Sequence, residues 1–190
     1  MKRIVILSLM LVASNAAIAQ ISGTSHNIGG GSYQGDGPGA ICVYCHTPHN
    51  ASSNEAPLWN HTMSSSTDYQ MYSSSTLNGT PTADNAQTQA CLACHDGTVA
   101  VNSIVNKPGG AFTPSGFMSG TALVGTDLRD DHPVGVSLTD GEDGLKTPTN
   151  AVLYSDAVEC ASCHAVHDDT YGNFLRMTNS DSGLCLDCHS

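Results

Sequence analysis

The pentad Cys-x-x-Cys-His occurs four times in this 190-residue chain and uses all eight of its cysteines. In this pattern two thiols add to the vinyl groups of a porphyrin, and the adjacent histidine binds the iron from one side. We therefore predict four haem c groups. Their covalent attachment sites are Cys42, Cys45, Cys91, Cys94, Cys160, Cys163, Cys185 and Cys188, and their proximal iron ligands are His46, His95, His164 and His189.

Paired cysteines also occur in disulfides and in zinc sites, so these two alternatives have to be weighed. Here a histidine follows each of the four pairs directly. Neither a disulfide framework nor a zinc ribbon requires that histidine. The repeated pentad therefore favours haem attachment over both.

Aromatic residues make up 5% of the chain, with one tryptophan and three phenylalanines. Side chains alone would then build a small core for this length, and four macrocycles can supply the missing apolar bulk. We expect a mostly irregular, loop-rich fold with short α-helices around four covalently bound haems, a multihaem cytochrome c in class. The repeated motifs suggest a duplicated dihaem module.

The chain begins with features of a secretory leader. Lys2 and Arg3 precede an apolar run at 4–13, and small residues at Ala17 and Ala19 suit cleavage. We expect a signal peptide at 1–19, an N-terminal dihaem half at 20–125 with a polar insert at about 63–89, and a C-terminal dihaem half at 126–190, together forming one compact haem-wrapped unit. No later run is long enough to span a membrane. The predicted location is extracellular or at the cell surface, otherwise periplasmic.

The formal net charge is −11, which excludes nucleic acid as a natural partner. The acidity favours surface solvation over a dedicated docking patch. A cationic electron-transfer partner stays open as an alternative.

The histidines follow an internal repeat. A lone histidine, a CxxCHxxH site and a CxxCH site occur in that order twice, beginning at His26 and at His132. His49 cannot bind the far side of the iron held by His46, because three residues reach at most about 10 Å. His49 is therefore either idle or the ligand of another haem. The distal ligands predicted by this count are His26, His49, His132 and His167, so that every iron carries two imidazoles.

His61 is left over from this count. We interpret it as a core or surface histidine beside Trp59, with a distal role as the alternative. Met63, Met71, Met118 and Met177 are interpreted as packing residues, because enough histidines exist to ligate the iron. Asp130 or Asp131 could accept the second ring N–H of His132 and orient the ring, and the alternative is a turn histidine before Pro133.

Several segments are more specific than the pentad itself: ICVYCHTPHN with APLWNH, CLACHDGTVA, LRDDHPVGVS, VECASCHAVHD and FLRMTNSDSGLCLDCHS. With them, most of the chain after the leader resembles the extracellular tetrahaem cytochromes of the OmcE type, which polymerise into haem-wired filaments. The resemblance implies little regular secondary structure, bis-histidine haems stacked in a continuous chain, and one distal ligand supplied by a neighbouring subunit. It implies distal roles for His49, His132, His167 and His26.

Six-coordinate irons leave no position for a substrate, so the predicted function is outer-sphere electron transfer and not enzymatic catalysis. Identical subunits in head-to-tail contact are one expected partner, with the Gly-rich arm around His26 as the segment that could reach the next haem. Redox proteins or extracellular electron acceptors are the others. A monomeric periplasmic carrier and a multihaem oxyanion reductase with one open haem remain as alternatives.

Overall fold

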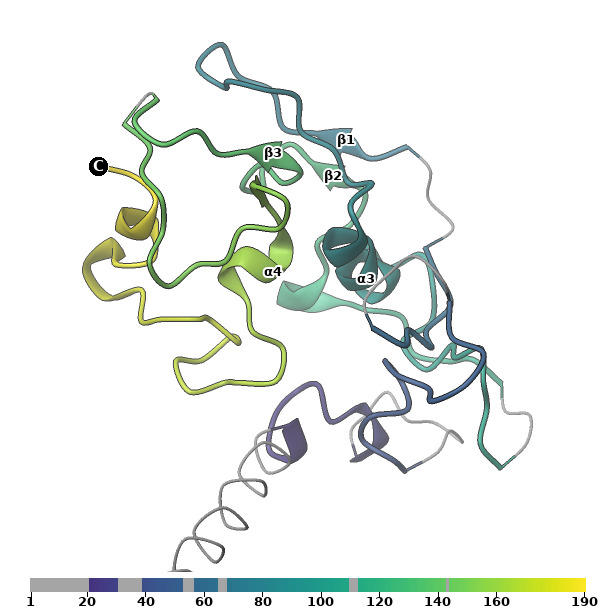
Figure 1. Ribbon diagram of the computed structural model, residues 1–190. Coiled ribbons are helices and arrows are strands. Elements are labelled where there is room, and N and C mark those ends of the chain that lie inside the picture. The colour runs from purple at the N-terminus through teal and green to yellow at the C-terminus, as the bar shows by residue number, and fades with distance from the viewer. Residues whose placement is uncertain (1–20, 31–38, 53–56, 65–67, 110–112, 143) are drawn as a thin grey trace, which may run out of the picture.

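The computed structural model describes residues 21–30, 39–52, 57–64, 68–109, 113–142 and 144–190, so the expected signal peptide at 1–19 lies outside the described residues. The regular elements are short, and irregular chain joins them (Figure 1). In chain order they are η1 (Ile28–Gly30), β1 (Gln70–Met71), α3 (Ala86–His95), η2 (Gly120–Ala122), β2 (Asp127–Leu128), β3 (Val136–Ser137), β4 (Ala157–Val158), α4 (Cys160–Cys163), η3 (Ser180–Ser182) and η4 (Cys185–Asp187). The expected loop-rich fold with short helices is confirmed.

Two helices that carry Cys-x-x-Cys-His motifs, α3 and α4, lie side by side at the centre of the molecule (Figure 1). α3 follows Asn85, whose backbone is extended, and ends where the Asp96 N–H donates to the Leu92 carbonyl. α4 follows Glu159, which forms a capping box with Ser162. A capping box satisfies backbone N–H groups that a helix leaves free at its start, so even this four-residue helix has a defined beginning.

The first, third and fourth motifs each close one helical turn. The histidine N–H donates to the carbonyl of the first cysteine, four residues earlier, at 2.8 Å in the first motif, 3.1 Å in the third and 2.9 Å in the fourth. A turn of this kind places the two sulfurs and the imidazole on one side of the chain. Each motif can therefore hold a haem at three points, the two sulfurs and the imidazole.

Two short strand pairs connect distant parts of the chain. β1 runs parallel to β2, pairing Gln70 with Asp127, and β3 runs antiparallel to β4, pairing Val136 with Val158. β1 lies in the polar insert, and the last residues of that insert form the first turn of α3. The insert is thus joined by hydrogen bonds to chain beyond residue 125.

The apolar core consists of small separate clusters. Ile28, Tyr44, Val101 and Ile104 form one, Trp59, Ala90 and Ala93 a second, and Ala83, Leu92 and Leu128 a third. Met118, Met63 and Met71 pack against these three clusters in turn. These three methionines therefore take the packing role that the sequence indicates.

Among the residues that the structure describes, no helix has the length and apolar character needed to cross a membrane.

Candidate haem-binding centre

Three of the four proximal histidines face a second histidine ring of the same chain. The ring centroids are 6.1 Å apart for His46 and His167, 6.2 Å for His95 and His26, and 6.4 Å for His189 and His132. In each pair one ring comes from a Cys-x-x-Cys-His motif and the other does not.

These separations match two imidazoles on one metal ion. A metal–imidazole bond is about 2 Å long, and the ring nitrogen lies about 1 Å from the ring centroid, so two opposed ligands have centroids about 6 Å apart. The residues present therefore fit a bis-histidine haem iron at three positions.

Backbone carbonyls fix the orientation of most proximal rings. A carbonyl oxygen can only accept, so the ring Nδ1 must carry the proton, which leaves Nε2 free to bind iron. The three contacts are His46 Nδ1 to the Pro57 oxygen (2.7 Å), His95 Nδ1 to the Ala122 oxygen (2.7 Å) and His164 Nδ1 to the Asn173 oxygen (2.8 Å).

His132 uses a backbone carbonyl as well, and here the sequence-based expectation is wrong. Its Nδ1–H donates to the Pro133 carbonyl at 3.0 Å, whereas the sequence suggested Asp130 or Asp131 as the acceptor. The carbonyl of the next residue is already in place and needs no side chain to be ordered. The distal ring is thus oriented by the DDHPVG turn itself.

His26 contacts residues that are far from it in the sequence. Its ring stacks on Phe174, with centroids 4.2 Å apart and planes inclined by 18°. Burial, with a smaller contribution from the neighbouring His95, lowers the pKa of His26 to about 4. The ring is then neutral near pH 7, which is the form that binds iron. The structure therefore places the His26 ring beside His95, the histidine of the second motif of the same chain.

The pairing of His46 with His167 joins the two halves of the chain. His167 belongs to the same CxxCHxxH segment as His164. Its ring faces the proximal ligand of the first motif instead of the iron bound by its own motif. The second histidine of that segment thus faces a different haem site, as the limited reach of three residues requires.

His49 and His164 are both exposed, and within the described ranges neither ring contacts another aromatic or histidine ring. His164 is nevertheless held in the proximal orientation by the Asn173 carbonyl. The described part of the chain therefore contains three pairs of facing histidine rings, while His49 and His164 have no ring partner there.

The attachment cysteines form a spatial series. The Cys45 sulfur lies close enough to Cys94 and Cys91 to raise the pKa of both thiols, although burial is the larger cause for Cys94. Cys91 shares a hydrogen bond with Cys160, which, with burial, raises the Cys91 pKa. Burial raises the pKa of Cys163, and the nearby Cys188 and Cys185 add to this increase. Cysteines of successive motifs therefore lie near one another.

Local contacts hold individual motifs in place. Residues 57–60 lie over the first motif, where Trp59 forms a β-bridge with His46 and buried Asn60 donates to the Val43 carbonyl. In the fourth motif, buried Asp187 accepts hydrogen bonds from residues 149–151. In both cases a distant segment of the chain fixes the motif.

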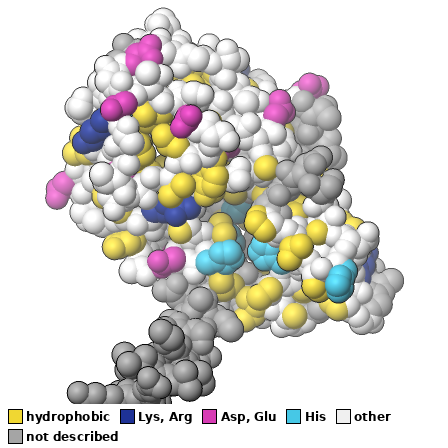
Figure 2. Space-filling model, viewed as in Figure 1, with side chains coloured by type: hydrophobic (Ala, Val, Ile, Leu, Met, Phe, Trp, Pro, Cys, Tyr) yellow, Lys and Arg dark blue, Asp and Glu magenta, His cyan; other side chains and the backbone are white. Residues whose placement is uncertain are grey.

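Exposed apolar side chains lie beside the histidine pairs, and Figure 2 shows histidines among hydrophobic side chains on one face. The Thr47 N–H donates to the carbonyl of exposed Leu58, next to His46. Exposed Val124 donates its N–H to the His95 carbonyl. Side chains of this kind suit contact with a macrocycle, which would remove them from water.

His61 lies in the core and not at an iron-binding distance from another histidine. It is buried beside Trp59, with ring centroids 6.4 Å apart. Its Nδ1 lies 2.7 Å from the Thr62 carbonyl, and its Nε2 lies 3.1 Å from the carbonyls of Ala100 and Val101. Both ring nitrogens therefore already face backbone oxygens.

A family model described as the doubled CXXCH motif matches residues 154–190. This match supports a multihaem c-type cytochrome. The matched segment contains the third and fourth motifs, which supports covalent haem c and an electron-transfer role for this cytochrome. No curated protein sequence matches the chain.

Some residues of the cytochrome site have no signature in the sequence. The carbonyls that orient the rings belong to Pro57, Ala122, Asn173 and Pro133, and a backbone carbonyl is present at every residue. Phe174 was also missed. Its place beside His26 depends on how residues 165–175 fold back against the third motif, through hydrogen bonds such as the one from Ala165 N–H to the Phe174 carbonyl.

Proposed function

We propose that the chain is a secreted tetrahaem cytochrome that conducts electrons along closely spaced bis-histidine haems as the subunit of an extracellular filament. One observation carries the proposal. Three proximal histidines have a ring partner in their own chain at an iron-sharing separation, while His164 and His49 are exposed and without one among the described residues.

The protein residues close the axial positions and set the spacing. Two imidazoles on an iron exclude substrate from the metal. When bound, the haems would supply one-electron carriers, and transfer between them would oxidise one iron as the next is reduced, without making or breaking a bond. Cysteines of successive motifs lie near one another, and α3 packs against α4, which supports close spacing of the haems. Close spacing supports outer-sphere transfer along the chain.

The two single histidines support the filament. If His49 of one subunit bound the iron held by His164 of the next, every haem would have two imidazoles. The contact would join two different surfaces, so it would repeat head to tail and extend without limit unless the rotation closed a ring. This assignment replaces the idea that the His26 arm reaches the neighbour, because the His26 ring lies against His95.

The unpartnered His164 also favours a second candidate function. A haem with one protein ligand has an open axial position, where a small oxyanion such as nitrite could bind and be reduced. A monomer with this open position would be a reductase and not a wire.

Light scattering and electron paramagnetic resonance of the purified holoprotein separate these functions, after the haem content has been measured as the pyridine haemochrome. If the chain is a filament subunit, the purified protein should form filaments in which all four haems are low-spin. In that case His49→Ala should give monomers with one high-spin haem that binds carbon monoxide. Pro48→Ala is the matched control, because Pro48 is exposed in the same loop and carries no ligand.

Each of the other outcomes decides against the filament. Wild-type monomers with one high-spin haem would support the reductase. Wild-type monomers with four low-spin haems would support a simple electron carrier. Fewer than four haems per chain would overturn the tetrahaem assignment itself.

A further inference from the structure

We propose that Glu159 lowers the reduction potentials of the two haems attached through Cys91 and Cys160. The inference rests on the proposed function, because it concerns haems that the motifs are expected to bind. It assigns to Glu159 a role in tuning electron transfer that goes beyond its place at the start of α4.

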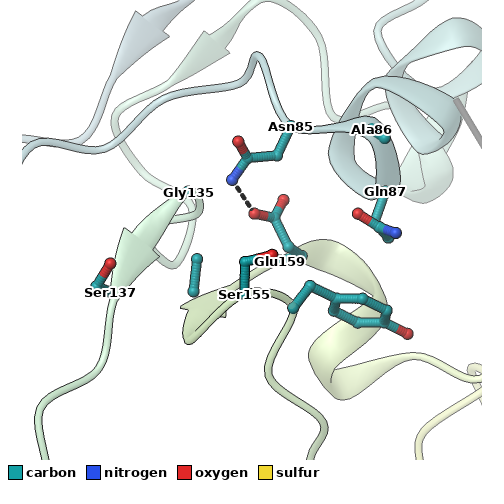
Figure 3. Close-up of a pocket in the computed structure, with 9 residues that line it drawn as sticks. Asn85, Ala86, Gln87, Gly135, Ser137, Ser155 and Glu159 are labelled. Carbon is teal, nitrogen blue, oxygen red and sulfur yellow. Dashed lines mark hydrogen bonds between the residues drawn. The ribbon is translucent and has the colours of Figure 1, made fainter. Parts of the chain in front are cut away.

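The Glu159 carboxylate is buried, with 1% of the residue exposed. It accepts hydrogen bonds from the Asn85 side-chain amide (Figure 3) and from the Thr88 hydroxyl, both at the start of α3. It also accepts the backbone N–H of Ser162 in the α4 capping box. Donors aimed at a carboxylate from three directions stabilise its negative charge.

The Glu159 carboxylate lies near two of the predicted haem sites. Glu159 directly precedes Cys160, and Thr88 lies one helical turn before Cys91 on α3. α3, which carries Cys91, packs against α4, which begins at Cys160. The carboxylate therefore lies at the junction where the second and third attachment sites meet.

No cation neutralises the carboxylate within the described part of the chain. The ion pair found there joins Arg129 to Asp127 on the surface. The half-buried Arg176 is the basic side chain beside the third motif, and it donates to the Ala161 carbonyl and the Tyr154 hydroxyl. Arg176 thus contributes opposite charge near the third haem without pairing with Glu159.

A hollow of about 480 Å³ borders Glu159, with Asn85, Gln87, Ser137 and Tyr154 among its lining residues (Figure 3). The carboxylate also accepts a hydrogen bond from the hydroxyl of the buried Thr88, and Glu159 directly precedes Cys160 in the chain. The charge is therefore screened less towards the haem attachment sites than towards the hollow.

A haem gains one negative charge when its iron is reduced. A nearby carboxylate opposes that gain and stabilises the oxidised form, and the effect is larger where water is excluded. The second and third haems, which lie nearest Glu159, should therefore be harder to reduce than they would be without it.

Glu159→Gln tests this, because glutamine keeps the shape and removes the charge. Spectroelectrochemical titration of the holoprotein should show two of the four one-electron midpoints moved to more positive potential and the other two unchanged. A His26→Met background identifies the haem at Cys91, because methionine ligation raises the potential of that haem. Glu142→Gln, an exposed carboxylate change, should move none of the four midpoints.

Thr88→Val separates charge from packing. It removes one donor and keeps the carboxylate, so the same two midpoints should move to more negative potential. This variant also tests the inference if Glu159→Gln fails to fold. Unmoved midpoints in a correctly loaded Glu159→Gln protein, or a Thr88→Val protein whose midpoints stay or rise, would overturn the inference and leave the proposed function intact. A wild-type protein without four covalent haems would instead overturn the proposed function.

Discussion

His167 faces His46 across the two halves of the chain, with ring centroids 6.1 Å apart. The first ligand follows the first pair of haem cysteines, and the second lies in the segment that carries the third pair. A haem bound between them would therefore join the two halves through its iron. A duplicated pair of independent dihaem modules would not need such a contact.

Replacing His167 should therefore affect the first haem and not the third. His167→Ala is expected to leave one of the four haems five-coordinate, because alanine cannot ligate iron. Carbon monoxide binding by the reduced protein and a high-spin electron paramagnetic resonance signal measure this change.

A second variant identifies the haem concerned. With Cys42 and Cys45 both replaced by alanine, the first haem is not attached, and adding His167→Ala should then produce no further high-spin signal. If the extra signal persisted in that background, His167 would serve a different haem.

The exposed pair of single histidines leads to a prediction about filament growth. A His49→Ala subunit keeps His164, so it can accept the His49 of a neighbour but cannot supply its own. Added to wild-type protein, it should cap filaments and shorten them in proportion to its fraction. Electron microscopy of mixed samples measures the lengths, with Pro48→Ala subunits as the control. Filaments of unchanged length containing the variant would show that His49 is not the connecting ligand.

The sequence predicts the local part of this site better than the long-range part. The Cys-x-x-Cys-His spacing specifies which residues are attached and which histidine is adjacent, because all of them lie on one helical turn. Whether His167 faces His46 depends on how segments far apart in the sequence fold against each other, and no local sequence pattern predicts that. The count of histidines therefore indicated candidate distal ligands without indicating the partner of each.

The same distinction explains the error at His132. A carboxylate next to a histidine is a recognisable signal, and it led to Asp130 and Asp131. The Pro133 carbonyl carries no such signal, yet it is the acceptor. Backbone carbonyls compete with side-chain carboxylates for the N–H of a histidine ring. A sequence pattern can reveal the carboxylates, but every residue has a carbonyl.

Asp187 should make the stability of the fourth haem site depend on pH. Burial opposes its ionisation, but hydrogen bonds from Ala151, Asn150 and Thr149 outweigh that effect and hold the Asp187 pKa well below its usual value. A carboxyl with a lowered folded-state pKa stabilises the protein above its unfolded pKa of about 3.9, and the contribution is lost as the pH falls further.

Asp187→Asn should reduce the free energy of unfolding by about 2 kcal/mol at pH 7, the scale of lost hydrogen bonds to a charged group. The difference from wild type should shrink as the pH falls below about 4, because the unfolded chain then binds a proton at Asp187 that the folded carboxylate, with its lowered pKa, does not bind until a lower pH. Urea unfolding of the holoprotein at several pH values measures both effects. Asp156→Asn, at an exposed position, is the control. A difference that stayed constant down to pH 2 would argue against the ionised form as the source of the stability.

Gly135 is required by the turn that presents His132. Its φ is +68°, and a β-carbon at this position would overlap the Thr82 carbonyl oxygen. The turn is also held by hydrogen bonds from Gly135 N–H to the Val158 carbonyl (2.7 Å) and from Thr82 N–H to the Val134 carbonyl (3.1 Å). Gly135→Ala therefore meets both backbone strain and a steric clash, with an expected cost of about 3 kcal/mol in the free energy of unfolding.

Gly141→Ala separates these two effects. Gly141 also has a positive φ, +80°, but nothing lies within 4 Å of the added carbon. Its expected cost is about 1 kcal/mol, from the left-handed conformation alone. Because the Gly135 turn carries a ligand of the fourth haem, Gly135→Ala should in addition produce a high-spin fraction, which Gly141→Ala should not. Equal destabilisation by the two substitutions, with both proteins fully low-spin, would mean that the contact with Thr82 does not position His132.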